Sequence, residues 1–382
     1  MSDPRLVEVR RCSRDVSWRT TWDFIEIVTS DGSVGVGEWS DAGPWQLAHP
    51  FMDAQASRFV GLPLESAMAQ VAADAEEAGR RDPRFAGRRR LELTVLGALD
   101  AALCDLAAQR AGVSVAGWLA PEEHRGAGDG RWNGGVPCYG NINRAVHDRT
   151  IDTVVQVAKE ALAAGFTRLK FAPFDFLVGA RRVSAGLELA AAVRDAVGAE
   201  AELMLDLHNQ LSVEEILTVG DALGGLGLRW LEDVGHLHDV EAHRRVRDEL
   251  GIPLAAGEFA ASPEELRPLL DAGAVDVVMP DVKHAGGPRR ALELARFAEG
   301  FGVEVSPHNP TGPVSSAHTA ALCEAVSSPG LLELAVLESD GRPALVEPRE
   351  ATTGGAYVTR PGPGLGVGLD PSAVWSNVHR IR

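Results

Sequence analysis

Three acidic residues are the side chains best placed to do chemistry in this sequence: Asp206, Glu232 and Glu258. Each closes a short apolar run that is typical of a buried strand, and 26 residues separate each acid from the next. This interval fits one strand, one helix and two loops, the repeat of a β/α barrel. The three carboxylates would then meet at the C-terminal ends of neighbouring parallel strands, where unpaired buried charge is costly. A divalent cation with oxygen ligands, most simply Mg²⁺, would balance that charge.

Two histidines occupy similar positions. His208 follows Asp206 by two residues and therefore shares its face of the strand. A protonated His208 beside a departing hydroxyl could act as a general acid, and a hydrogen-bonded loop histidine is the alternative. Asp281 and His308 end two neighbouring predicted strands, so they can form an Asp–His pair of the kind that suits a general base. A purely structural Asp–His hydrogen bond is the alternative there.

Lys170 and Glu333 stand at the ends of two further predicted strands. Lys170 could bind a substrate carboxylate or move a proton, or it could be an exposed lysine. Glu333 could hydrogen-bond an oxygen of an intermediate, or it could pair with Lys170 or a loop arginine. Functional side chains at so many successive strand ends indicate a catalytic barrel mouth more strongly than any one of them does.

The elements that must hold these residues alternate from Val136 onward. The predicted strands are 136–141, 167–172, 202–207, 228–232, 253–257, 275–280, 303–306 and 331–335. Helical stretches lie between them, for example 154–164 with its apolar stripe. Alternating strands and helices predict a parallel sheet with helices outside, and about eight strands favour a closed TIM-like barrel over an open, doubly wound sheet.

The N-terminal part has a different pattern and predicts a separate α+β domain. Two alternating runs, 21–29 and 34–39, flank Asp31-Gly32, which is a strong hairpin signal. Residues 52–81 and 92–111 predict helices. The whole chain then divides into an α+β domain, a linker, a barrel and a C-terminal segment that returns to the first domain, with predicted bounds 1–120, 121–135, 136–350 and 351–382.

Composition excludes several classes of function. A net charge of −17 argues against binding to nucleic acid, which requires basic patches. The four cysteines are scattered without a CxxC pair, which argues against a zinc site and a disulfide framework. The sequence shows neither a signal peptide nor an apolar run long enough to cross a membrane, so we expect a cytoplasmic protein.

With these residues in view, the sequence resembles the enolase superfamily, and within it the mandelate racemase subgroup, over nearly the whole chain. Besides the strand-end residues, the resemblance rests on residues 31–38, 98–106 and 363–367. It implies an α+β capping domain over a modified (β/α)₇β barrel. It also implies that loops at about 13–22 and 41–50 close the site and read the substrate, and that the protein is a homo-oligomer.

The resemblance implies a role for each strand-end residue. The implied residues are the Mg²⁺ ligands Asp206, Glu232 and Glu258, the histidine–aspartate dyad His308 and Asp281, and the strand-eight glutamate Glu333. The motif at 206–208 and the run 306–313 most resemble sugar-acid dehydratases of the galactonate type. In those enzymes the counterpart of His208 is the general acid for the leaving hydroxyl.

One departure from the family pattern selects among reactions. Many members carry a second base two residues after the counterpart of Lys170, and this chain has Ala172 there. A racemase needs a base on each face of the substrate, whereas a dehydratase needs one base and one acid. The sequence therefore predicts dehydration of an aldonate or aldarate to a 2-keto-3-deoxy acid, with His308 as base and His208 as acid. A racemase or epimerase that uses Lys170 against His308 is the alternative, and a barrel kept only for binding or structure is a third.

Overall fold

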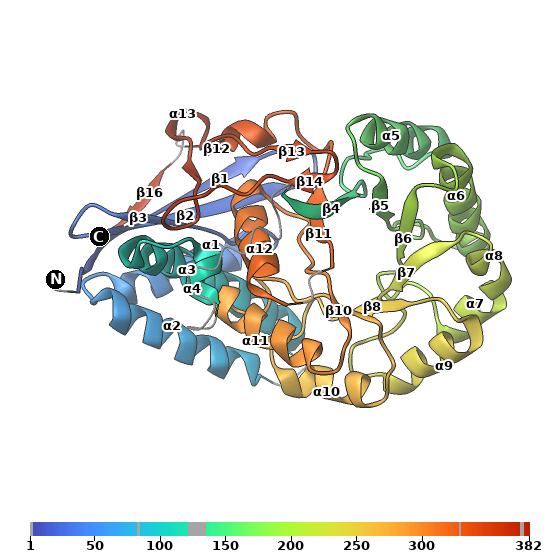
Figure 1. The fold of residues 1–382 in the computed structure, drawn as a ribbon, viewed down its shortest axis with the longest axis horizontal. Helices are drawn as coiled ribbons and strands as arrows, with labels where there is room; N and C mark the ends of the chain where they lie inside the picture. The colour runs from blue at the N-terminus through green and yellow to red at the C-terminus, as the bar shows by residue number, and fades with distance from the viewer. Residues whose placement is uncertain (1–2, 82–84, 121–134, 328–329, 375–377) are drawn as a thin grey trace.

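The computed structural model describes residues 3–81, 85–120, 135–327, 330–374 and 378–382. Within them the chain forms an N-terminal α+β unit beside a barrel with helices on its outside (Figure 1). Among these residues, no helix combines the length and the apolar character needed to span a membrane.

The barrel contains eight parallel strands. They are β4 (Val136–Asn141), β5 (Arg168–Phe171), β6 (Glu202–Asp206), β7 (Leu228–Glu232), β8 (Leu254–Ala256), β9 (Val277–Val278), β10 (Glu304–Val305) and β11 (Leu332–Ala335). Strands β4 to β10 pair in chain order, and β11 pairs with β4. The N–H of Gly330 donates to the carbonyl of Val305 at 2.7 Å, which joins β11 to β10 and completes the ring.

Helices fill every crossover between these strands. They are α5 (Ile151–Ala163), α6 (Arg182–Val197), α7 (Val213–Thr218), α8 (Gly220–Gly224), α9 (Val240–Leu250), α10 (Pro263–Asp271), α11 (Pro288–Glu299) and α12 (Pro313–Ala325). Local signals set several helix ends: Thr150 accepts from the N–H of Thr153 at the start of α5, and Gly251 ends α9 in the left-handed region. The predicted (β/α)₇β barrel is confirmed.

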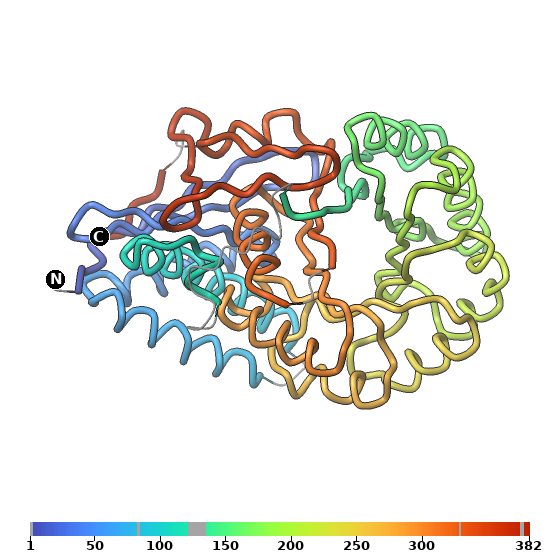
Figure 2. Tube along the Cα trace, viewed as in Figure 1, coloured from blue at the N-terminus to red at the C-terminus, as the bar shows by residue number. Residues whose placement is uncertain are grey.

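The N-terminal unit is an antiparallel sheet packed on helices, as a capping domain requires. Its strands are β1 (Leu6–Asp15), β2 (Thr21–Thr29), β3 (Val34–Glu38) and β16 (His379–Ile381), and its helices are α1 (Trp45–Phe59), α2 (Leu64–Gly79), α3 (Ala86–Ala111) and α4 (Val115–Leu119). The C-terminal strand β16 pairs with β1, so the two ends of the chain both lie in the capping domain (Figure 2). The domain bounds stay a prediction, and most of the predicted linker lies outside the described residues.

The segment after the barrel runs back along the capping domain. It contains a 3₁₀ helix (Arg342–Leu345), β12 (Val346–Glu347), β13 (Thr352–Thr353), β14 (Ala356–Tyr357), β15 (Gly368–Leu369) and α13 (Pro371–Val374). Strand β14 pairs antiparallel with β4, which ties this segment to the first barrel strand.

Two sequence predictions about the capping domain were wrong in detail. The predicted helix at 52–81 is two helices, because Gly61 adopts a positive φ of 88° and Pro63 precedes the first residue of α2. The predicted loops at 13–22 and 41–50 are both shorter, since β1 continues to Asp15, β2 begins at Thr21 and α1 begins at Trp45.

The glycines of β3 have a packing role. A Cβ on Gly35 would lie 2.1 Å from the carbonyl oxygen of Ala102, and one on Gly37 would lie 2.2 Å from that of Ala98. Both carbonyls belong to α3, so these two glycines allow the sheet and the helix to approach closely.

Glu38, the last residue of β3, fastens the capping domain to the barrel. Its buried carboxylate accepts from the N–H groups of Gly312 at 2.6 Å and Ser315 at 2.9 Å, at the start of α12. A carboxylate is favoured at a helix N-terminus, where N–H groups lack partners within the helix. His318 of α12 continues this contact through a 3.0 Å hydrogen bond between its Nε2 and the carbonyl of Val36.

This buried histidine predicts a loss of stability in acid. Burial, only partly offset by the hydrogen bond to Val36, lowers the pKa of His318 to about 4. An unfolded histidine titrates near 6.5, so between these values the unfolded chain binds more protons and stability falls as the pH decreases. We expect the free energy of unfolding to fall from pH 6.5 to 4 by about 3 kcal/mol more in the parent than in His318→Gln. Denaturant titrations across this pH range test the expectation. An equal decrease in the free energy of unfolding in the parent and in His318→Gln would contradict it.

Candidate active site

The predicted ligand carboxylates lie together at the C-terminal ends of β6, β7 and β8. Asp206 and Glu232 are direct partners in the register of β6 and β7. Glu258 follows β8 through Gly257, whose φ of 117° turns the chain at this point. The exposed fractions of these acids are 4%, 1% and 9%, so their charges must be compensated within the protein.

Lys170 of β5 supplies part of that compensation. Its Nζ lies 2.7 Å from Glu232 Oε1, 3.0 Å from Glu333 Oε1 and 3.8 Å from Asp206 Oδ2. Burial opposes the charge on Lys170, but the surrounding carboxylates outweigh it and raise the pKa of its ammonium well above the ordinary value. Only 1% of Lys170 is exposed, so it is not a surface lysine, and its pairing with Glu333 is one of the arrangements anticipated from the sequence.

Glu333 is held by barrel groups on both sides. The side-chain amide of Asn141 donates to its Oε1 at 2.6 Å, and the backbone N–H of Asn309 donates to its Oε2 at 2.8 Å. Burial alone would raise the pKa of Glu333, but Lys170, and then His308, lower it below the ordinary value. Glu333 is therefore a fixed carboxylate at the barrel mouth.

His308 and Asp281 form the pair expected from their strand ends. The Nδ1 of His308 lies 2.8 Å from Asp281 Oδ2, and its Nε2 lies 2.8 Å from Glu258 Oε2. Burial disfavours the imidazolium, yet Glu258 leads the groups that raise the pKa of His308 well above its ordinary value. Lys283, which sequence reasoning did not single out, places its Nζ 2.9 and 3.0 Å from the two oxygens of Asp281.

His208 lies between two carboxylates. Its Nε2 is 2.9 Å from Asp206 Oδ2, and its Nδ1 is 2.7 Å from Asp175 Oδ1. Burial disfavours its charge, but Asp206 and then Asp175 raise the pKa of His208 to about 12. Asn143 donates to the second oxygen of Asp175 at 3.1 Å, and we call His208, Asp175 and Asn143 the acid network. Asp175 was missed from the sequence because it lies in the loop after β5 and not at a strand end.

Asp233 is a further acid that sequence reasoning missed. It follows Glu232 with a positive φ of 55°, and it is nine-tenths buried. Burial, with Glu258 and Asp206 beside it, raises the pKa of Asp233 well above the ordinary value. Among the described residues, the site therefore holds more carboxylates than its two lysines and two histidines balance, which favours a further cation.

The donor set at Asp206, Glu232 and Glu258 fits a hard divalent cation, because it consists of buried carboxylate oxygens. A different group, Asp281, His284 and His308, brings potential ligand atoms within 4.8 Å of one another. We favour the carboxylates, since the ammonium of Lys283 already occupies both oxygens of Asp281 and would repel a cation there.

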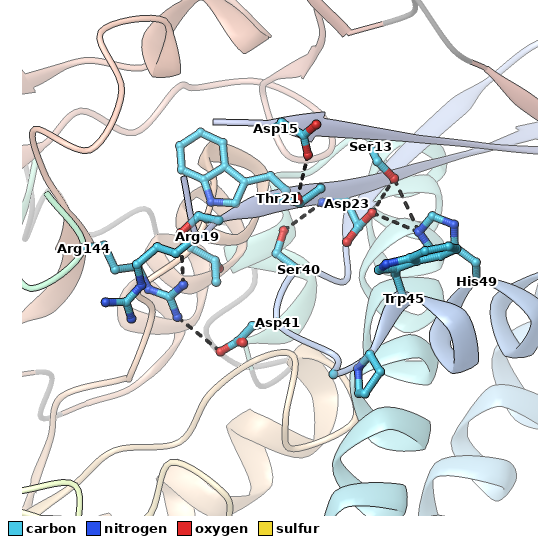
Figure 3. Close-up of a pocket in the computed structure, with 15 residues that line it drawn as sticks. Ser13, Asp15, Arg19, Thr21, Asp23, Ser40, Asp41, Trp45, His49 and Arg144 are labelled. Atoms are coloured by element: carbon cyan, nitrogen blue, oxygen red, sulfur yellow. Dashed lines mark hydrogen bonds and ion pairs between the residues drawn. The ribbon is translucent and has the colours of Figure 1, made fainter. Parts of the chain in front are cut away.

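Two cavities adjoin the barrel mouth. The first, of about 470 Å³, is lined by the predicted substrate-reading segments, with Arg144 and Thr311 added from the barrel (Figure 3). The second, of about 750 Å³, lies between the start of α3 and the barrel, and Glu258 and His284 line it. Asp41 lies beside both cavities: it lines the first and forms a 2.6 Å ion pair with Arg90, which lines the second.

Comparison with known proteins places the chain among relatives of one superfamily. A family model described as enolase C-terminal domain-like matches residues 153–373. D-galactarolactone cycloisomerase from Agrobacterium fabrum is 31% identical over 363 residues, which cover 92% of this chain and 89% of that enzyme. D-gluconate dehydratase from Thermoproteus tenax is 30% identical over 312 residues, or 79% of this chain and 59% of that enzyme. A crystal structure of a mandelate racemase/muconate lactonizing enzyme-like protein from Rubrobacter xylanophilus matches with a TM-score of 0.82 and 26% identity, over 97% of each chain.

The family model covers more than half of the chain, and the first of these relatives aligns with nearly all of it. The fold predicted from the sequence, a capping domain beside a (β/α)₇β barrel, is also the fold observed. The protein is therefore an enzyme of the enolase superfamily.

Proposed function

We propose that this enzyme is a Mg²⁺-dependent dehydratase of sugar acids, which removes the C2 proton of an aldonate or aldarate and eliminates the C3 hydroxyl. The observation that carries the proposal is the position of two histidines on opposite sides of one carboxylate cluster: His308 contacts Glu258, and His208 contacts Asp206. One base and one acid at a single site are the groups that elimination of water needs.

Each residue has a task in this proposal. His308 accepts the C2 proton, and Asp281 holds its ring through Nδ1 at 2.8 Å. His208, kept protonated by its carboxylate partners, donates a proton to the departing hydroxyl. Lys170 offers an ammonium to the substrate carboxylate beside Glu333.

The cation would be held by Asp206, Glu232 and Glu258. When bound, it would balance the charge of these carboxylates and stabilise the charge that develops on the substrate carboxylate. Glu258 would then no longer hold the proton-accepting Nε2 of His308, whereas Asp175, which is not one of the three ligands, would still pair with His208. The enol product of elimination then tautomerises to a 2-keto-3-deoxy acid.

A sugar-acid lactone is a second candidate substrate. The relative that aligns over 92% of this chain is named a D-galactarolactone cycloisomerase. Removing a proton next to a carboxylate would use the same base, and the neighbouring ring oxygen would leave as a carboxylate without a proton from the acid.

Racemisation or epimerisation is less favoured. Ala172 offers no proton-transfer group, and Glu232 and Glu333 keep Lys170 protonated, so it cannot act as a base. An epimerase would incorporate deuterium at C2 of recovered substrate with inversion, whereas recovered substrate that keeps its configuration would exclude this alternative.

The proposal is tested by incubating the Mg²⁺-loaded protein with a panel of aldonates, aldarates and their lactones. Formation of 2-keto-3-deoxy acids, assayed with semicarbazide, is the expected result. A folded protein that turns over no member of the panel would contradict the proposal.

A further inference from the structure

Arg19, in the loop between β1 and β2, is in a position to bind a ligand from outside the chain. It lines the cavity of about 470 Å³ shown in Figure 3. Its guanidinium carbon lies 5.9 Å from the ring centre of Trp18 and 5.5 Å from that of Phe176, so aromatic faces support it. Its Nη1 is buried and has no hydrogen-bond partner among the described residues. Buried donors are almost always paired, so this position favours an acceptor from outside the chain.

The surrounding charge favours an anion as that acceptor. Arg144 lines the same cavity, and its described polar contacts are Thr20 at 3.5 Å and Asp41 at 3.3 Å. Asp41 is shared, because Arg90 also pairs with it at 2.6 Å. Asp41 therefore serves two other guanidiniums, and Asp175 and Glu338 act on Arg19 only through space, so none of these carboxylates is a hydrogen-bonded partner of Arg19 among the described residues. Burial, followed by repulsion from Arg144, lowers the pKa of Arg19.

Arg19 is also close to the groups proposed to act on the substrate. Arg149 packs on the same Phe176 ring, with its guanidinium carbon 5.9 Å from the ring centre. Arg149 in turn donates to the side chain of Asn143, a member of the acid network, at 2.8 Å. The unpaired guanidinium is therefore one aromatic ring away from the residues that hold the proposed general acid.

From these contacts we infer that Arg19, assisted by Arg144, binds a second carboxylate at the end of the substrate remote from C2. This inference rests on the proposed function and narrows its substrate class to dicarboxylic sugar acids, the aldarates. The planar guanidinium fork matches the two oxygens of a carboxylate. An aldonate offers only a hydroxyl at that position, which cannot form the paired, charge-assisted hydrogen bonds of a carboxylate.

The test compares galactarate with galactonate, which differ at C6 in having a carboxylate or a hydroxymethyl group. We expect the parent to favour galactarate in kcat/KM by about 10- to 100-fold, the range for a hydrogen bond to a charged group. Arg19→Met keeps an apolar stem against the aromatic rings and should collapse that ratio toward one. Arg80→Met is the matched control, because Arg80 is an exposed residue at the end of α2 outside the cavity lining, and it should keep the parent ratio.

Several outcomes would overturn the inference. Arg19→Met could slow both substrates equally, which would make Arg19 a structural support of its loop, for example toward the nearby Glu338. A parent that prefers galactonate or a galactarate lactone would also overturn it.

A parent that turns over no sugar acid would contradict the proposed function separately. In that case, calorimetry of galactarate and galactonate binding to the Mg²⁺-loaded parent tests whether Arg19 binds a second carboxylate. A preference for galactarate that is lost in Arg19→Met supports it, and equal binding of the two acids overturns it.

Discussion

His308→Asn should abolish both dehydration and exchange of the C2 proton, with a loss of between about 10²- and 10⁴-fold in kcat. An asparagine amide can keep a hydrogen bond toward Asp281 and Glu258, but it cannot accept a proton at catalytic pH. Asp281 cannot readily replace it as the base, since the ammonium of Lys283 holds both oxygens of Asp281. Turnover of the best sugar acid, together with deuterium incorporation at C2, measures the effect.

The loss must be separated from misfolding. The thermal midpoint of His308→Asn and its stabilisation by Mg²⁺ should stay close to those of the parent. His379→Asn, at an exposed position of β16, is the matched control and should keep full activity. Substantial C2 exchange in a folded His308→Asn enzyme would show that another group is the base.

Glu232→Gln should remove the response of the protein to Mg²⁺. Burial raises the pKa of Glu232, although Lys170 opposes this shift. The surroundings therefore disfavour the charged carboxylate, and a bound cation should stabilise it. Mutating a residue that only orients metal ligands lowers the metal affinity by about 10- to 100-fold, and mutating a ligand should lower it at least as much. In the parent, Mg²⁺ at 100 times its Kd should stabilise the fold by about 2.7 kcal/mol.

The measurement is the thermal midpoint with and without Mg²⁺, supported by calorimetry of metal binding. Glu202→Gln is the matched control: Glu202 begins β6, pairs with Arg168 and Arg229, and lies at the opposite end of the strand from Asp206. This control should keep the Mg²⁺ shift and the activity of the parent. An unchanged Mg²⁺ shift in Glu232→Gln would mean that the cation is bound elsewhere.

The barrel and most of the candidate site could be predicted from the sequence, because both depend on a repeat. Buried parallel strands read as apolar runs, and an acid that ends each run must appear at the same edge of the barrel. The structure brings Asp206 and Glu232 together for this reason.

What the sequence did not reveal lies outside that repeat. Asp175 occupies a loop whose path depends on tertiary packing, and Lys283 reaches Asp281 only because the chain turns after β9. Strand β1 was not predicted, since its charged residues Glu8 and Arg10 obscure the apolar alternation. In the structure these charges pair with each other at 2.6 Å, which explains how such a strand is tolerated.

The proposed mechanism assigns the base to His308 and the acid to His208, and His208→Asn in D₂O tests these separate roles directly. Proton NMR should follow exchange at C2 and formation of the 2-keto-3-deoxy acid in one sample, with Mg²⁺ present. We expect elimination to slow by between about 10²- and 10⁴-fold while His308-dependent exchange at C2 continues. Loss of exchange and elimination to the same extent in a folded, Mg²⁺-binding variant would contradict the role of His208 as the acid.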